Sequence, residues 1–191
     1  MADLRDKKLS IEDVNGMDFQ QFIETFASVI EHTRLVAATV WSYRPYANLQ
    51  ALHRAFANFI QTDLFPEARA GIIRCHPDLA GKLSQSRQLS KESTREQTAA
   101  GLLELTDSER KELTTLNERY KKKFGFPFVV CARENKKEAI FAGLRARLGN
   151  EVADEVQEAV KEISKIAWYR LNDVVIGDET HQGSDGNDSK L

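Results

Sequence analysis

The sequence has 191 residues, 41% of them hydrophobic and 29% charged, which is the composition of an ordinary soluble globular domain. Its 27 basic and 29 acidic residues nearly balance, so the chain carries no electrostatic footprint for nucleic acid or for an anionic membrane surface. Two cysteines give no disulfide framework, no apolar run approaches the roughly 20 residues that span a bilayer, and the first residues do not resemble a secretory signal, so we expect an intracellular protein.

Apolar residues recur at helical spacing along most of the chain. In its first half this spacing predicts helices over residues 19–30, 49–60 and 67–75, with a short apolar segment at 35–41 between the first two. Residues 82–92 are polar and contain only two leucines, so we expect them to form a connection on the surface.

Two Ser/Thr-x-x-Glu patterns predict helix starts in the second half of the chain, because the two side chains of such a pattern cap each other's backbone N–H groups. Residues 93–96 would open a helix through Leu105, and residues 106–109 would open a second helix that Gly125 ends. Two more periodic stretches predict helices over 136–148 and 152–174.

The run from Phe126 to Ala132 is the only extended-looking apolar stretch, and no second strand is available to pair with it. Helices without a sheet indicate an all-α fold, a single-domain helical bundle of about seven or eight helices with one short extended segment near 126–132. We expect this domain to occupy residues 1–176. Residues 177–191 are polar and rich in glycine, so we expect a flexible tail there.

The sequence carries none of the common metal or cofactor signatures. Its four histidines are scattered, with no His-x-x-x-His and no Cys-x-x-Cys pair, so we expect no metal site. Neither a glycine-rich phosphate loop nor a nucleophile elbow occurs. An enzyme with this sequence would therefore work by acid–base and electrostatic catalysis, without a cofactor.

One histidine is placed where acid–base groups are often found. His76 follows an apolar, helix-like run and stands directly before Pro77, where helix is disfavoured. Taken alone, a histidine is more often a surface residue or a satisfied core residue than a catalyst. The interpretation of His76 therefore depends on what the rest of the chain offers.

Three further segments could complete a site around this histidine. Residues 93–97 offer a carboxylate, an amide and a hydroxyl at a helix start, although Glu96 would serve equally as the glutamate of a capping box. Residues 126–132 would have unpaired backbone groups that a planar, amide-rich ligand could satisfy, unless they are simply core. Arg170 lies beside the apolar stripe of the last helix and either snorkels to water or binds an anion, with Arg147 as a competing candidate.

In chain order these segments read H-P-D-L-A-G-K from His76, S-x-x-E-Q-x-x-A-G-L from Ser93 and L-N-x-x-Y-x-x-K-F-G-F-P-F from Leu116. Together the motifs resemble the OHCU decarboxylases of ureide metabolism, over a stretch from about Met17 to Val175. Those enzymes convert 2-oxo-4-hydroxy-4-carboxy-5-ureidoimidazoline (OHCU) to (S)-allantoin, the last step of urate breakdown. The family is all-α, cofactor-free and usually dimeric.

The resemblance implies a role for each matching residue. His76 would be the catalytic proton donor, Pro77 a substrate contact, Glu96 the catalytic carboxylate and Arg170 the active-site arginine. The residues expected to line the substrate from the helix start are Ser93, Thr94, Arg95, Glu96 and Gln97. The residues expected to present backbone groups to its ureido and ring amides are Phe128, Val129, Val130, Cys131 and Ala132.

The chemistry of such a substrate explains these residue types. Its leaving carboxylate is attached to a hydroxylated carbon next to a C=N bond, so the electrons released with CO₂ can flow into that imine. The protein must orient the scissile bond, accommodate developing charge and protonate one face of the ring carbon. Whether His76 handles the hydroxyl or delivers that proton is open, as is whether Glu96 orients the histidine or the hydroxyl.

The last three residues, Ser189-Lys190-Leu191, match the tripeptide that peroxisomal import receptors read. We therefore expect a peroxisomal protein whose partners are the ureidoimidazoline substrate, the import receptor and a second copy in a homodimer, but neither nucleic acid nor a membrane. The alternative function is a non-catalytic helical interaction module in which an exposed Phe126-Pro127-Phe128 binds a partner.

Overall fold

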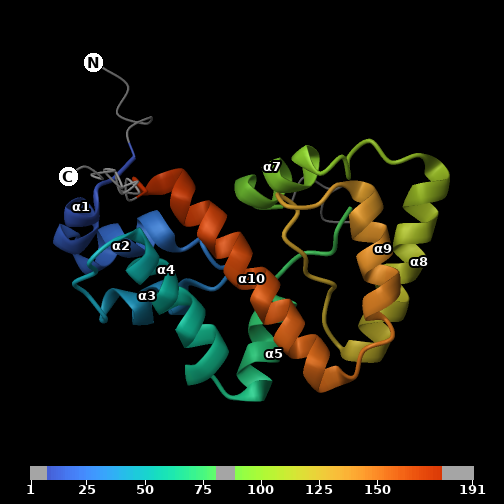
Figure 1. Cartoon of the computed structure of the whole chain (residues 1–191), viewed down its shortest axis with the longest axis horizontal. Helices are drawn as coiled ribbons and strands as arrows, with labels where there is room; N and C mark the ends of the chain where they lie inside the picture. Colours follow the sequence, from blue (N-terminus) through green and yellow to red (C-terminus); the bar gives the residue numbers. More distant parts are fainter. Residues whose placement is uncertain (1–7, 81–88, 178–191) are drawn as a thin grey trace, which may run out of the picture.

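The longest helix, α10 (Val152–Val174), crosses the molecule diagonally and separates the helices of the first half of the chain from those of the second half (Figure 1). The structure, a computed structural model, describes residues 8–80 and 89–177. Both ends of the described chain meet beside the end of α10, where Leu9 and Val175 form an isolated parallel bridge. None of the helices in the described ranges is long and apolar enough to cross a membrane.

The first half of the chain forms short helices joined by tight connections. They are α1 (Ile11–Gly16), α2 (Phe19–Phe26), α3 (Arg34–Trp41), α4 (Leu49–Asn58), the π-helix η1 (Phe59–Asp63) and α5 (Pro66–Arg74). Ser10 and Asp18 open α1 and α2 with capping boxes. Helices α4 and α5 pack directly against α10, so the end of α5, where His76 follows, is anchored at the centre of the molecule.

The second half contains α7 (Lys91–Ala99), α8 (Asp107–Phe124) and α9 (Lys137–Arg147). The predicted start and end of α8 are confirmed: Thr106 and Glu109 form a capping box, and Gly125 ends the helix in the left-handed conformation with φ of 76°. Glycine adopts this φ without the steric penalty that other residues incur.

The capping box predicted for residues 93–96 is wrong. Helix α7 begins three residues earlier, because the Ser90 side chain accepts a hydrogen bond from the N–H of Ser93 and serves as the N-cap. Glu96 therefore lies inside the helix rather than in its first turn. The helix ends at Ala99 instead of continuing to Leu105.

The all-α fold is confirmed. Residues 8–80 and 89–177 contain nine α-helices, one more than the upper expectation, because α1 has only six residues and shows no recognisable period. The helix predicted over 19–30 is shorter and ends at Phe26. All but the first residue of the tail expected over 177–191, and residues 82–88 of the polar connection expected over 82–92, lie outside the described residues.

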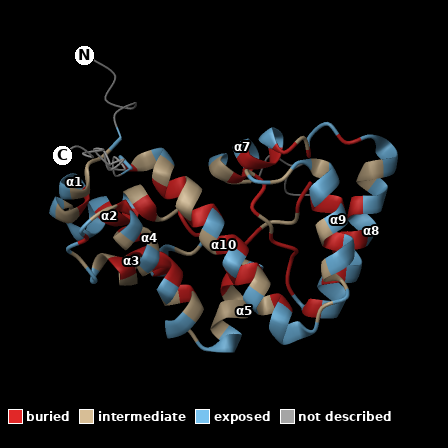
Figure 2. Ribbon diagram, viewed as in Figure 1, coloured by how far each residue is buried: buried red, intermediate tan, exposed pale blue. Residues whose placement is uncertain are grey.

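The segment predicted to be extended is non-helical and buried, and no strand within the described ranges pairs with it. Figure 2 shows it as a largely red thread between α10 on one side and α8 and α9 on the other. Phe126 and Phe128 are each 2% exposed and pack around Tyr120 of α8. The alternative function, an interaction module, required these phenylalanines to be exposed. That expectation is wrong, because both side chains are buried and not available to a partner.

Candidate active site

His76 is fixed at the point where α5 ends. Its backbone N–H donates to the carbonyl of Ile73 at 3.1 Å, and Pro77 prevents the helix from continuing. The ring Nδ1 lies 3.1 Å from the carbonyl oxygen of Ile72. Because a carbonyl only accepts, Nδ1 carries the hydrogen and Nε2 presents a lone pair. Nε2 is buried without a hydrogen-bond partner in the described structure.

Burial keeps this imidazole neutral. The cost of placing a charge in the interior lowers the pKa of His76 from its ordinary 6.5 to about 4, even though Nδ1 is hydrogen-bonded to Ile72 and Glu31 lies nearby. At neutral pH the ring is therefore a hydrogen-bond acceptor at Nε2.

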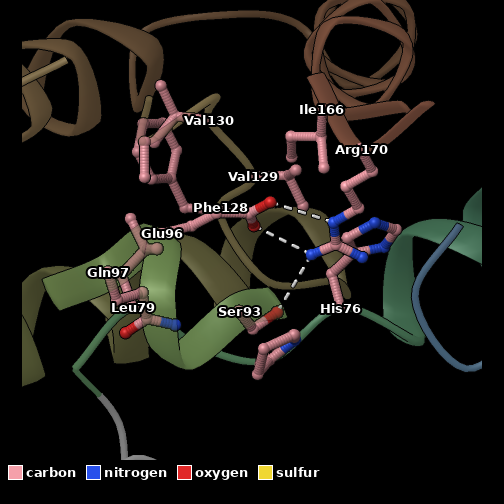
Figure 3. Close-up of a pocket in the computed structure, with 12 residues that line it drawn as sticks. His76, Leu79, Ser93, Glu96, Gln97, Phe128, Val129, Val130, Ile166 and Arg170 are labelled. Carbon is pink, nitrogen blue, oxygen red and sulfur yellow. Dashed lines mark hydrogen bonds and ion pairs between the residues drawn. The ribbon is translucent and has the colours of Figure 1, made fainter. Parts of the chain in front are cut away.

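Arg170 of α10 uses all five of its N–H donors within the protein. Nε and Nη2 form a two-pronged pair with Glu96, at 3.0 Å to Oε1 and 2.8 Å to Oε2 (Figure 3). Nη1 donates to Glu31 Oε2 and to the carbonyl of Ser28, both at 2.7 Å, and Nη2 also donates to Ser93 Oγ at 3.2 Å. No guanidinium donor is left for a ligand in this arrangement.

Glu31 also belongs to this cluster, although no sequence motif predicts it. It follows α2, has a side chain only 1% exposed, and accepts a second hydrogen bond from Ser93 Oγ at 2.9 Å. Burial alone would raise the pKa of Glu31, but Arg170 and the hydrogen bonds outweigh it and hold that pKa below its usual value. No motif surrounds Glu31, so only its position among apolar neighbours could have singled it out.

A second arginine, Arg133, reaches the same cluster from the turn that follows the buried segment. Arg133 Nε lies 3.5 Å from Glu96 Oε1, and its two terminal nitrogens pair with the carboxylate of Asp173 on α10. Glu96 therefore faces arginine side chains on two sides.

His76, Glu96 and Arg170 border a cavity with an empty volume of about 360 Å³, which includes space open to solvent. Figure 3 shows Arg170 reaching from α10 toward Glu96 and Ser93 of α7, with His76 beside them. The lining residues are His76, Pro77, Leu79, Ser93, Glu96, Gln97, Phe128, Val129, Val130, Ala132, Ile166 and Arg170.

Ten of the residues expected in the site thus share one cavity, and Leu79 and Ile166 join them. Three others are elsewhere. Thr94 and Arg95 are exposed on the outer side of α7, and Cys131 donates its N–H to Glu162. The competing Arg147 does not line the cavity. The described ranges hold no group of three His, Cys, Asp or Glu side chains that could bind a metal ion.

A sequence model of one protein family, described as OHCU decarboxylase, matches residues 15–172. The chain is 45% identical to 2-oxo-4-hydroxy-4-carboxy-5-ureidoimidazoline decarboxylase of Amia calva, with 91% of this chain and 98% of that protein aligned. The protein of the same name from Xenopus laevis is 39% identical, over 90% of this chain and 97% of its own. The chain is also 36% identical to the uric acid degradation bifunctional protein PucL of Bacillus subtilis, of which it covers 33%.

Solved structures share the fold at lower sequence identity. The crystal structure of (S)-allantoin synthase has a TM-score of 0.69 at 20% identity, over 87% of this chain and 54% of that one. A crystal structure of OHCU decarboxylase in the presence of (S)-allantoin has a TM-score of 0.59 at 23% identity, over 72% of this chain and 87% of that one.

Proposed function

This chain belongs to the OHCU decarboxylase family and is a decarboxylase of urate degradation, and we propose that it acts without a cofactor through His76, Glu96 and Arg170. The substrate is OHCU and the product is (S)-allantoin. The observation that supports the proposed roles is the single cavity in which a neutral imidazole, a buried carboxylate and backbone from a non-helical segment converge.

The substrate can supply its own electron sink. When the bond between C4 and the carboxylate breaks, CO₂ leaves and its electron pair forms a C4=C5 bond, while the π electrons of the neighbouring C=N bond move to nitrogen, which is protonated. Loss of the hydroxyl proton from C4 and protonation of C5 then give the C4 carbonyl and the ureido-bearing carbon of allantoin. One proton is consumed overall and no oxidant or reductant is needed, which supports a cofactor-free reaction.

His76 is first a base in this scheme. Its Nδ1–H is hydrogen-bonded to the carbonyl of Ile72, and its Nε2 is an unpartnered acceptor at the cavity. It can accept the proton of the substrate hydroxyl and return a proton to C5. His76 would then act as the expected proton donor with a proton taken from the substrate itself. Delivery from one side of the cavity would account for a single enantiomer of the product.

Arg170 acts through Glu96. Since all its donors are taken, it is not free to pair with the leaving carboxylate, and its role is to hold the Glu96 carboxylate in one orientation. This arrangement favours decarboxylation, because a cation bound to the leaving carboxylate would stabilise the ground state more than the transition state, in which that charge moves into the ring. Glu96 is then placed to accept N–H groups of the substrate.

The direct test is turnover of freshly generated OHCU by the purified protein, followed by circular dichroism of the product. We expect rapid formation of (S)-allantoin, at an unchanged rate after exhaustive dialysis against a chelator. Racemic product formed at the spontaneous rate would refute the proposed activity, and loss of activity on chelation would refute a cofactor-free mechanism.

We expect Glu96→Gln to lower kcat/KM by about 10²-fold or more, because a positioned carboxylate is lost from the site. Glu96 is not a capping residue, so the helix start should be unaffected. Thr98→Ala is the matched control, since Thr98 is exposed on the same helix. Steady-state kinetics and far-ultraviolet circular dichroism of both variants make the comparison, and wild-type kinetics in Glu96→Gln would remove Glu96 from the mechanism.

We further propose that Ser189-Lys190-Leu191 is a peroxisomal address and, on the family resemblance, that the protein is a homodimer. A fluorescent protein ending in residues 177–191 should accumulate in peroxisomes, and the same fusion without the final three residues should stay in the cytosol. Equal distributions of the two fusions would show that the tripeptide is not the signal. Sedimentation of the purified protein measures its oligomeric state.

A further inference from the structure

Arg147 lies behind the cavity wall and contacts the segment that forms it. Its Nη1 donates to the carbonyl of Val129 at 2.9 Å, and its guanidinium lies over the Phe128 ring, 4.6 Å from the centroid. Glu155 of α10 holds the other side of Arg147, with its Oε1 at 2.8 Å from Nε and 2.5 Å from Nη2. Both Phe128 and Val129 line the cavity, whereas Arg147 does not.

The Glu155 carboxylate that pairs with Arg147 also accepts hydrogen bonds from two other side chains. It is 0% exposed, and it accepts hydrogen bonds from the Tyr120 hydroxyl and, at 2.7 Å, from Asn150 Nδ2. Four groups from α8, α9, α10 and the turn before α10 thus meet at one buried point. Such a satisfied network is rigid, since no member can move without leaving a buried polar group unpaired.

A second buried glutamate holds the same segment two residues further on. Glu162 of α10 accepts the N–H of Cys131 on Oε2 at 2.7 Å, while Lys165 occupies its Oε1 at 2.6 Å. In a planar trans peptide unit, the C=O of one residue and the N–H of the next residue point in opposite directions. Because Arg147 holds the C=O of Val129 and Glu162 holds the N–H of Cys131, the N–H and C=O of Val130 point away from these two side chains, and Val130 itself lines the cavity.

We propose that Arg147 and Glu162 are positioning residues that present the backbone amide of Val130 to the cyclic ureide substrate. This inference rests on the proposed function. Amide groups of the ligand are donors and acceptors in a plane, and a peptide unit held in one orientation matches them at no cost in reorganisation. The contact is made with substrate and transition state alike, so its loss should raise KM and leave kcat nearly unchanged.

The test measures OHCU kinetics together with calorimetric binding of (S)-allantoin, which needs no turnover. In Arg147→Met/Glu155→Gln, which removes both charges and so leaves no unpaired carboxylate, we expect KM and the allantoin Kd to rise about tenfold, with kcat within about threefold of wild type. Arg147→Lys should recover part of the affinity, because lysine can still donate once to the Val129 carbonyl.

Two controls separate positioning from general destabilisation. Arg145→Met removes an exposed arginine of the same helix that pairs with Glu112, and it should change neither constant. Tyr46→Phe removes a buried hydrogen bond to Val40 away from the cavity, and it should lower Tm without changing KM. Wild-type KM and Kd in the double variant, or an equal rise of KM in Tyr46→Phe, would overturn the proposal. Failure of the proposed function is distinguishable, because the unmutated protein would then neither turn over OHCU nor bind (S)-allantoin.

Discussion

Replacement of His76 by alanine should reduce kcat for OHCU decarboxylation by about 10²- to 10⁴-fold, the range that general acid–base groups contribute. The reason is that its Nε2 is the unpartnered buried acceptor at the cavity, placed to move the hydroxyl and ring protons. Stopped-flow or steady-state assay with chiral detection of allantoin measures the loss. His53→Ala is the control, because His53 is half-buried against Ser164 and does not line the cavity.

The pH dependence of kcat/KM and of stability in the wild-type protein tests the protonation state of His76. Its pKa is lowered from 6.5 to about 4 in the folded protein, so the unfolded chain binds more protons between these values. Stability contributed by the neutral ring is thus fully present above pH 6.5 and is lost as the pH falls toward 4. The kcat/KM of the wild type should stay high down to about pH 4, and an acidic limb near 6.5 would contradict the neutral-base assignment.

Replacement of Arg170 by methionine should give the largest loss of stability, about 3–5 kcal/mol, because it leaves two buried carboxylates without their shared cation. Activity should fall with it, since Glu96 loses the pair that orients it. Chemical denaturation at pH 7.5 measures the change in the free energy of unfolding. Lys161→Met is the control on α10, as Lys161 forms only an exposed pair with Glu158.

The sign of the pH effect identifies the cause of that instability. Without Arg170, Glu31 remains buried and loses the charge that lowers its pKa, so its pKa rises and the folded state binds the proton more tightly than the unfolded state. Stability of the variant relative to wild type should therefore improve as the pH is lowered from 7.5 to about 5. A deficit that is constant with pH would point to lost packing instead.

The parts of the fold that could be predicted are those with local causes. The start and end of α8 follow from Thr106, Glu109 and Gly125, all within one turn of the helix ends. The start of α7 was misplaced because Glu96 fits a capping pattern by spacing, yet its carboxylate binds Arg170, 74 residues away. A tertiary ion pair of this kind leaves no trace in the local sequence.

In the candidate site, too, the residues that belong to sequence motifs could be predicted and those placed only by tertiary contacts could not. Family motifs brought His76, Ser93 and Gln97 into one prediction, and the structure places all three on the cavity. Glu31 belongs to no motif, and its one sequence signal, a position among apolar neighbours after an apolar helix, does not indicate a role in a site. The supporting role of Arg147 was equally hidden, since its distance from the Val129 carbonyl depends on how α9 packs against the buried segment.

The hydrogen bonds of Arg170 also bear on how the enzyme is made. Arg170 is 139 positions from Glu31 and 74 positions from Glu96 along the chain. These hydrogen bonds therefore form only after distant parts of the chain have come together. Contacts that close such long loops are entropically expensive and tend to come late in folding. Catalytic competence should consequently return in the final step of refolding, and a polypeptide still emerging from the ribosome has no active centre until α10 is available.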